Sequence, residues 1–455
     1  MKKLITTLKN IWNIKDLRER ILFTLFILMV YRFGCYVVLP GVDAGELARQ
    51  TAASGGQGLI GLINAFSGGA FLGAAVFALG IMPYITASII IQLLGFAVPY
   101  FQRLQQREGE SGRKKLTQIT RWLTVAITLV QGSGYLTYIV ANGALAPAME
   151  GSKTLFYFAN LIILSTGTIF AMWLGERITD KGIGNGISLL ITVGIIATLP
   201  GAFITEVTKQ LSAPLVLVIE MALLFFVVLA TILVVQGVRR IPIQFAKRMV
   251  GRSSNAMPAQ GVRDYIPLKV NAAGVMPIIF AQALMFLPAT VAQFAVGAEN
   301  ASQSGFLNAM NDFTSWQYNV VYFFLVVIFT YVYTALLVNP TQYAEYLKRQ
   351  NSFIPGIKPG KNTADFIDSV TTRITLPGSI FLGLISILPA FAARLGVEIS
   401  FAMFFGGTSL LILVAVVLDT LQQIDSHLLM RKYDGLVKSG RGQGRSRVQG
   451  IGASM

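Results

Sequence analysis

Few residues in this chain have the chemistry needed for catalysis or for holding a metal ion. The sequence contains one cysteine, Cys35, and one histidine, His427. A single cysteine cannot close an internal disulfide, and a lone histidine lacks the neighbouring ligands that a zinc site requires. The sequence therefore argues against zinc and thiol chemistry, and we expect no cofactor, no metal and no enzymatic activity.

Two glycine-rich segments resemble phosphate-binding loops only in composition. Residues 358–363 read Lys-Pro-Gly-Lys-Asn-Thr, without the glycine spacing of a P-loop, and they join two apolar segments rather than a strand and a helix. The basic, glycine-containing tail from Ser439 follows no strand and is predicted to be disordered. The sequence thus shows no nucleotide site.

Ionisable side chains inside apolar segments are functional candidates, because a charge in hydrocarbon is costly. Three residues meet this description: Arg32, Glu220 and Asp419. Glu220 and Asp419 lie near the ends of their segments, where exposure at the membrane surface explains them equally well. Arg32 lies within the first apolar segment.

The elements that must position these residues are membrane-spanning helices. The chain is 54% hydrophobic and only 13% charged, and its repeated apolar stretches are long enough to cross a bilayer. The first apolar stretch lacks a small-residue cleavage site and is expected to stay in the mature protein. Ten spans are predicted, at about 21–40, 75–98, 122–141, 154–174, 187–205, 214–236, 271–293, 318–338, 374–393 and 402–422.

The distribution of basic residues predicts how these spans are oriented. Of the 37 lysines and arginines, 32 lie in alternate gaps between spans and 4 in the others, with Arg32 inside the first span. Because cytoplasmic loops carry an excess of Lys and Arg, both termini are predicted to be cytoplasmic and the number of spans even. Most of the net charge of +16 is therefore topological.

Two features interrupt the regular pattern of spans. Pro83, Pro277 and Pro288 lie within apolar spans, where proline removes a backbone hydrogen bond and can kink a helix. The segment 58–70 is apolar and glycine-rich but too short to cross alone. It is either a re-entrant, cavity-lining segment or an interfacial loop, and its composition leaves both open.

Two predicted cytoplasmic gaps, about 237–270 and 339–373, are longer than topology requires. The alternating apolar residues of the first, such as Ile241 and Ile243, favour a short β-hairpin. Each gap is either a solvated basic connector or a docking surface for an acidic or phosphate-rich partner such as ribosomal RNA. The basic residues concerned include Arg239, Arg240, Lys247, Arg248, Arg252, Lys358 and Lys361.

The stretch 77–94, Phe-Ala-Leu-Gly-Ile-Met-Pro-Tyr-Ile-Thr-Ala-Ser-Ile-Ile-Ile-Gln-Leu-Leu, resembles the second helix of the SecY/Sec61-alpha family, the channel-forming subunits of the Sec translocon. Further blocks similar to this family follow in the expected order along nearly the whole chain. They are Tyr31–Gly34, Phe66–Gly69, Glu108–Lys115, Gly182–Ser188, Pro267–Asn271, Pro355–Gly360 and Phe405–Leu411.

The resemblance implies an all-α integral membrane protein whose ten transmembrane helices form two inverted, pseudo-symmetric halves around an hourglass pore. The halves would be 1–205 and 206–438, followed by a basic flexible tail, 439–455. The family's pore ring, an aliphatic collar at the waist of the pore, would seal against ions by dewetting or by gripping the chain. The matching residues are Ile81, Ile85, Ile187, Ile191, Ile279 and Ile412.

The resemblance also implies a plug and a lateral gate. The plug, about 58–70, would be a short helix that closes the pore at rest, with the residues Gly58, Leu59, Ile60, Leu62, Ile63, Phe66, Gly68 and Gly69. Ser88, Gln131 and Asn271 are polar candidates for the gate seam. Polar contacts between membrane helices are weak, which suits a gate that must reopen, although local helix packing explains these residues equally well.

The function implied by the resemblance is a protein-conducting channel of the general secretory pathway in the bacterial plasma membrane. It would translocate unfolded preproteins and release transmembrane segments into the lipid. The implied partners are SecE, SecG, the SecA ATPase, ribosomes and preproteins with signal sequences. Lys358 stands where bacterial members usually carry an arginine that couples to SecA, so the charge is kept without the planar fork.

Two other classes of function compete with the channel. A secondary transporter would place coupling carboxylates or broken-helix ion sites at the midplane, yet the central parts of the spans are nearly uncharged apart from Arg32. An intramembrane hydrolase would need a serine with a histidine, or paired aspartates, at membrane depth, whereas His427 lies near the tail. Both readings are weaker than the channel.

Overall fold

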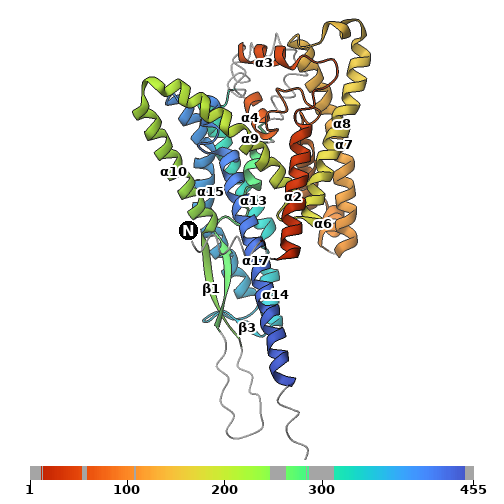
Figure 1. Cartoon of the computed structure of the whole chain (residues 1–455). Helices are drawn as coiled ribbons and strands as arrows, with labels where there is room; N and C mark the ends of the chain where they lie inside the picture. The colour runs from red at the N-terminus through yellow and green to blue at the C-terminus, as the bar shows by residue number, and fades with distance from the viewer. Residues whose placement is uncertain are drawn as a thin grey trace, which may run out of the picture. The chain divides into compact units, whose positions relative to one another are not determined.

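The computed structural model describes residues 12, 14–53, 59–106, 109–245, 263–282, 284–285 and 312–445, which are mostly helical. Figure 1 shows their helices and strands coloured along the chain. Packing divides the chain into two compact units. The first unit comprises residues 1–50, 64–197 and 416–455, and the second comprises 51–63 and 198–415.

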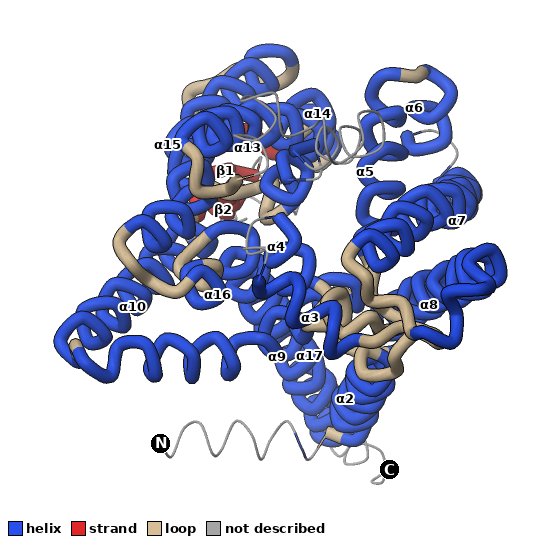
Figure 2. Tube along the Cα trace, turned by 90° about the horizontal axis from the view of Figure 1, so that it is seen from above, coloured by secondary structure: helices blue, strands red, loops and turns tan. Residues whose placement is uncertain are grey.

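The first unit consists of helices packed side by side. Helix α5 packs against α7, α7 against α8 and α8 against α2, an arrangement that Figure 2 shows from above. Its helices are α2 (Lys15–Gly34), α5 (Met82–Ala97), α6 (Pro99–Gln106), α7 (Gly109–Ala141), the 3-10 helix η1 (Pro147–Ser152) and α8 (Lys153–Lys181), with parts of α3 (Ala44–Ala53), α4 (Leu59–Phe66), α9 (Gly186–Lys209) and α17 (Gly407–Arg445).

The first two predicted spans have different limits in the structure. Helix α2 ends at Gly34 rather than at 40, and α5 begins at Met82 rather than at 75. Turns and one isolated β-bridge, Val38 to Ala75, replace the helix between these limits. The two pieces bind each other: Leu39 N donates to Ala74 O, and Val76 N to Val37 O, both at 2.8 Å. Backbone groups at membrane depth must find such internal partners.

Pro83 and Pro277 lie at the starts of helices rather than at kinks within them. Pro83 lies in the first turn of α5, and Pro277 follows Met276, where the helical segment 276–282 begins. The prediction of kinks at these two positions is therefore wrong. The first turn of a helix tolerates proline because its N–H groups have no partner within the helix. Pro288 lies outside the described residues.

The second unit combines apolar helices with a small sheet. Helix α15 packs against both α13 and α14, and β1 lies between β2 and β3, antiparallel to both. Its elements include the 3-10 helix η2 (Gln210–Ser212), α10 (Pro214–Gln236), β1 (Val238–Phe245), β2 (Arg263–Lys269), α13 (Trp316–Leu337), α14 (Pro340–Arg349), β3 (Ser352–Phe353), α15 (Lys361–Arg394) and α16 (Ile399–Ala402).

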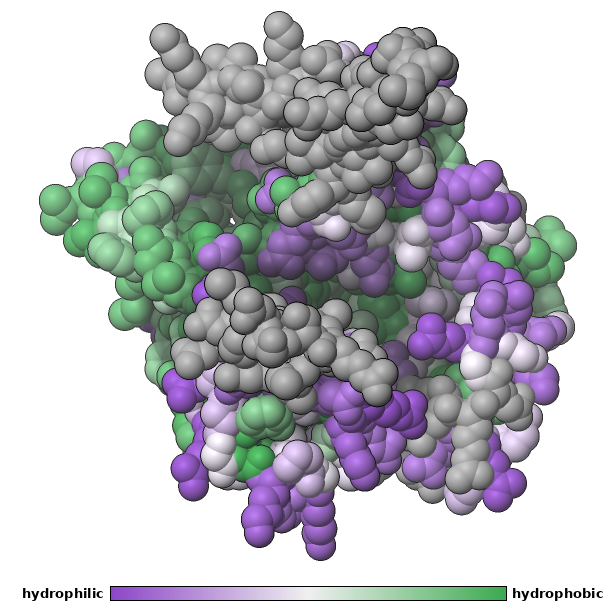
Figure 3. Space-filling view, turned by 90° about the horizontal axis from the view of Figure 1, so that it is seen from below, coloured by the Kyte–Doolittle hydropathy of each residue, from purple (hydrophilic) through white to green (hydrophobic). Residues whose placement is uncertain are grey.

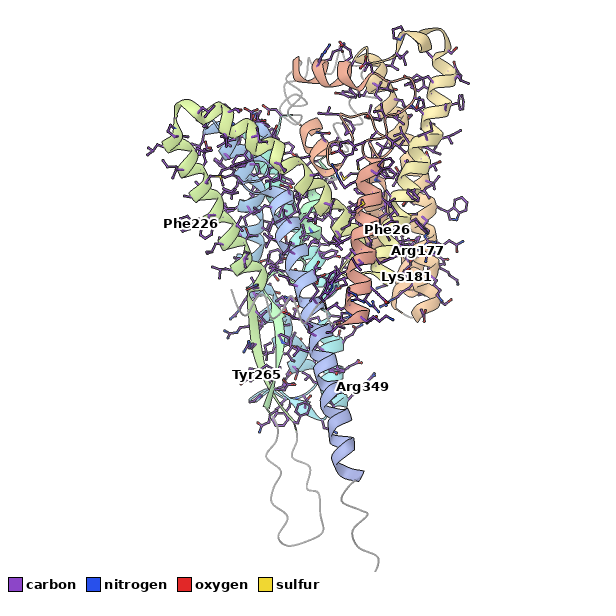
Figure 4. The ribbon with its side chains drawn as sticks, viewed as in Figure 1. Phe26, Arg177, Lys181, Phe226, Tyr265 and Arg349 are labelled. Atoms are coloured by element: carbon purple, nitrogen blue, oxygen red, sulfur yellow. The ribbon has the colours of Figure 1, made fainter. Side chains whose placement is uncertain are left out.

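Seven helical segments within the described residues are long and apolar enough to cross a membrane. They correspond to α7, α8, α9, α10, α13 with α14, α15 and the part of α17 up to Leu429. Helix α10 keeps only 11% of its apolar window buried, and its Phe226, labelled in Figure 4, is 67% exposed. Such a face suits lipid better than water. The total of ten spans stays a prediction, since α2, the shorter α5 and the segment from 276 supply the remaining candidates.

The predicted halves of inverted symmetry do not have the same boundaries as the two packing units. Residues from 198 pack with the second unit, whereas residues from 416 return to the first. The halves 1–205 and 206–438 stay a prediction. Helix α17 continues to Arg445, so the described chain is helical beyond 439, where the flexible tail was predicted to start. Residues 446–455 lie outside the described part.

Candidate functional site

Four of the six pore-ring isoleucines belong to the first unit. Ile81 is the N-cap residue of α5 and Ile85 lies one turn later, while Ile187 and Ile191 lie on α9. Ile81 is buried in the apolar core of the unit, and Ile85 and Ile187 pack against that same core. Ile191 is also buried. The structure thus brings three of these side chains from two helices into one apolar cluster.

The other two isoleucines belong to the second unit. Ile412 is buried on α17, and Ile279 is half-buried in the segment 276–282. Their sequence neighbours Ile278 and Leu411 both enter the core of this unit, together with Tyr322. Because the six residues are divided between two separately described units, the ring stays a prediction.

A short helix lies where the resemblance implies the plug. Helix α4 runs from Leu59 to Phe66 and is followed by turns through Gly68 and Gly69. These two glycines have φ values of +67° and +90°, a region that side-chain-bearing residues rarely adopt. Gly58 lies outside the described residues. Glycine is required here by backbone conformation and not only by loose packing.

Arg32 is bound to the segment that follows α4. Its Nη1 donates to the carbonyl oxygen of Gly68 at 2.9 Å, and its Nη2 donates to the hydroxyl of Tyr36 at 3.0 Å. The guanidinium also lies over the Tyr36 ring, 5.2 Å from its centroid. The charge that the sequence analysis singled out is therefore paired with polar groups inside the first unit.

Glu220 is buried rather than exposed at the end of its helix. Its Oε1 accepts from Gln210 Nε2 at 3.4 Å. Glu206 accepts from the backbone N–H of Glu398 at 2.7 Å. Exposure at the membrane surface therefore does not explain Glu220, which joins α10 to η2, while Glu206 joins α9 to the residue before α16. Asp419 accepts from Gln423 on its own helix.

The three gate candidates have different surroundings. Ser88 accepts from Gln92 Nε2 at 3.2 Å on the same helix, α5, which is the local packing that the sequence left open. Gln131 is half-buried on α7. Asn271 is buried, and its Oδ1 has no hydrogen-bond partner among the described residues. A buried amide oxygen without a hydrogen-bond partner destabilises the fold. Of the three candidates, Asn271 is therefore the one whose side chain would gain a stabilising hydrogen bond from a new partner.

The two long basic gaps fold together as one body in the second unit, here named the hairpin body. The predicted hairpin is confirmed, with Arg240 of β1 opposite Pro267 of β2. Strand β3, which the sequence analysis missed, adds to β1 through Gln244 and Phe353. The shared core, here named the hairpin core, consists of Ile241, Ile243, Leu268, Leu347, Ile354 and Ile367.

Exposed basic side chains surround this core. Arg239 and Arg240 are exposed on β1, as are Lys358 before α15 and Lys361 at its start. Tyr265 on β2 and Arg349 on α14 mark the same body in Figure 4. Figure 3 shows hydrophilic areas beside hydrophobic ones on the face seen from below. Lys247, Arg248 and Arg252 lie outside the described residues. The body thus presents basic groups from both gaps.

The loop around Lys358 has a fixed backbone. Gly356 and Gly360 adopt φ values of +85° and +104°, and the hydroxyl of Thr363 donates to the carbonyl of Lys358 at 2.9 Å. Nearby Ile354 is anchored in the hairpin core. The lysine side chain is therefore held outward on a structured loop.

The comparisons with known proteins agree with this architecture. The SecY family model matches residues 75–421. The chain is 42% identical over 451 residues to the protein translocase subunit SecY of Streptomyces coelicolor, covering 96% of this chain and 100% of that protein. It is 38% identical over 465 residues to the same subunit of Chlamydia muridarum, covering 97% and 100%.

Solved structures show the same fold at low sequence identity. One described as a protein-conducting channel has a TM-score of 0.61 at 18% identity, covering 90% of this chain and 91% of that one. Canine Sec61 in a ribosome–channel complex has a TM-score of 0.60 at 17% identity, with the same coverage. The family model and the full-length relatives establish that this chain belongs to the SecY family.

Proposed function

We propose that this chain is the pore-forming subunit of a protein-conducting channel. It translocates unfolded preproteins of the general secretory pathway and releases transmembrane segments sideways into the lipid. The observation that carries this proposal is the similarity to SecY translocase subunits over nearly the whole chain, on a fold shared with a protein-conducting channel. The family is one of translocation channels rather than of enzymes.

The proposed moving parts are the pore ring, the plug and the lateral gate. Support for the ring comes from the apolar cluster that Ile81, Ile85 and Ile187 share. Support for the plug comes from α4, and from a related structure described as showing that the SecY plug domain stabilises the closed channel. Asn271 is the gate residue that the structure favours, because its buried oxygen lacks a partner.

We further propose the partners and the orientation. The hairpin body, with Arg239, Arg240, Lys358 and Lys361, faces the cytoplasm and binds SecA or the ribosome. A ribosome-bound relative supports the second partner. SecE and SecG are proposed as the small membrane subunits of a complex in the bacterial plasma membrane, with both termini of this chain cytoplasmic.

Reconstitution tests the proposal directly. The full chain, co-expressed with SecE and SecG, is placed in proteoliposomes with SecA, ATP and a labelled preprotein. We expect the preprotein to become resistant to added protease, and the same preprotein without its signal sequence to stay sensitive. A complex that assembles but protects neither substrate, while it accumulates a small labelled solute, would instead indicate a transporter.

A further inference from the structure

The segment that follows α4 is unusually constrained for a connection. Phe66 at the end of α4 is buried, and so are Ser67 and Gly68, which follow it in a turn rather than continuing the helix. The Gly69 N–H donates to Asn64 O at 2.9 Å, and the Phe71 N–H donates to Ser67 Oγ at 3.0 Å. These bonds satisfy backbone groups that would otherwise be unpaired at membrane depth.

Arg32 adds a contact from another helix. It lies in the last turn of α2, where the partial negative charge of the helix end favours a cation. Arg32 would stabilise the end of α2 electrostatically without contacting any other segment. Its Nη1 nevertheless donates to the carbonyl oxygen of Gly68, outside α2, at 2.9 Å. The planar guanidinium can hold this bond and the bond to Tyr36 at the same time.

Gly194 closes the other side of the same segment. A Cβ atom on Gly194 of α9 would lie 2.7 Å from Phe66 O and 3.3 Å from Gly68 N. A Cβ atom on Gly68 would lie 2.8 Å from the Cα of Gly194 and 2.5 Å from Nη1 of Arg32. The two backbones therefore touch, and only glycine at both positions allows this contact.

Arg32, Gly68 and Gly194 all belong to the first unit, whereas α4 crosses the boundary between units: residues up to Ile63 pack with the second and residues from Asn64 with the first. We propose that Arg32 and Gly194 clamp the C-terminal end of α4 and thereby set its closed position. This inference rests on the proposed role of α4 as the plug. Arg32 and Gly194 are positioning residues, since they act through the segment 66–68.

Alanine substitution at two glycines of α9 separates the clamp from general packing. The added methyl of Gly194→Ala must displace residues 66–68, whereas a methyl at Gly201 meets nothing within 4 Å. We expect Gly194→Ala to raise the resting conductance of planar bilayers and to admit preproteins with defective signal sequences. Gly201→Ala should match the wild type in both assays.

Arg32 variants test the other side of the clamp. Arg32→Gln should raise the displaced population of α4 about tenfold, the effect of one lost hydrogen bond to a charged group. Arg32→Lys keeps the charge but not the fork and should fall between Gln and wild type. If Arg32 only stabilises the end of α2, the Arg32→Gln variant will have a lower unfolding temperature but an unchanged ion leak. The double variant Arg32→Gln, Gly194→Ala should leak no more ions than the leakier of the two single variants, because both substitutions act on one segment.

The lone cysteine provides a readout that does not depend on transport. Cys35 is buried, with its Sγ 3.9 Å from the carbonyl oxygen of Ser67. Displacement of residues 66–68 should therefore speed maleimide labelling of Cys35 in Gly194→Ala and Arg32→Gln, but not in Gly201→Ala. Unchanged labelling and leak in both clamp variants would overturn the clamp.

Deletion of residues 59–66 separates failure of the clamp from failure of the plug. A deletion variant that inserts, binds its partners and still seals the bilayer would refute the plug role, and with it the clamp. A deletion variant that leaks, beside clamp variants as tight as the wild type, would refute the clamp alone.

Discussion

The side-chain Oε1 of Gln423 accepts a hydrogen bond from the backbone N–H of Gly184 at 2.8 Å, although 239 residues separate them. Gly184 is buried with φ +84°, and it precedes α9, which carries two of the pore-ring isoleucines. The bond joins the middle of α17 to the loop before α9 within the first unit. It is one of the contacts that hold the part of α17 from residue 416 in the first unit.

Gln423→Leu should destabilise the first unit, because it leaves the buried N–H of Gly184 without its acceptor. The expected loss of unfolding free energy is about 1–3 kcal/mol. Thermal unfolding in detergent measures it. Gln422→Leu, on an exposed neighbour, is the matched control, and equal unfolding temperatures for both variants would contradict the assigned role.

Replacing Ile85 and Ile191 together with serine should widen and wet the proposed constriction and so increase ion leakage. Planar-bilayer conductance of the resting complex measures this. Ile196 lies on the same helix as Ile191 but is 47% exposed, so Ile196→Ser should leave the seal intact. A double variant as tight as the wild type would remove these two side chains from the seal.

Lys358→Glu should reduce SecA-driven translocation steeply, because it places like charge against an acidic partner surface, whereas Lys358→Arg should preserve or improve it. ATP-dependent protection of a preprotein in proteoliposomes is the measurement. Lys348→Glu makes the same charge change at an exposed site of α14 and is expected to have a smaller effect. Normal transport by Lys358→Glu would leave this loop as a solvated connector.

Ile241→Ala should loosen the hairpin body, because this side chain is 4% exposed in the hairpin core. Truncating a buried isoleucine costs about 2–5 kcal/mol. The rate of tryptic cleavage after Arg239 and Arg240, both within β1, should rise. Tyr265→Ala, at a residue that is 53% exposed on β2, should be cleaved like the wild type. An unchanged cleavage rate in Ile241→Ala would contradict the role assigned to Ile241 in the hairpin core.

Much of this architecture could be predicted from the sequence because it follows from local patterns. A run of apolar residues long enough for a bilayer specifies a helix wherever it lies, and α10 begins and ends where its span was predicted. The β-hairpin followed from the alternation around Ile241 and Ile243. Arg32 could also be identified from the sequence as a candidate, because a cation in an apolar segment requires a partner.

Which partner Arg32 finds depended on the tertiary structure. Nothing in the sequence distinguishes Gly194 from Gly201 on the same helix, yet one touches the backbone after α4 and the other meets open space. Nor could the sequence show that residues of both basic gaps share one core.

Contacts of this kind depend on how distant segments meet, and a local pattern records only what a residue prefers, not what lies against it. The sequence by itself determined the membrane helices, their expected orientation and the family resemblance. Only the tertiary structure placed Arg32 on Gly68, Gln423 on Gly184 and Glu206 on Glu398.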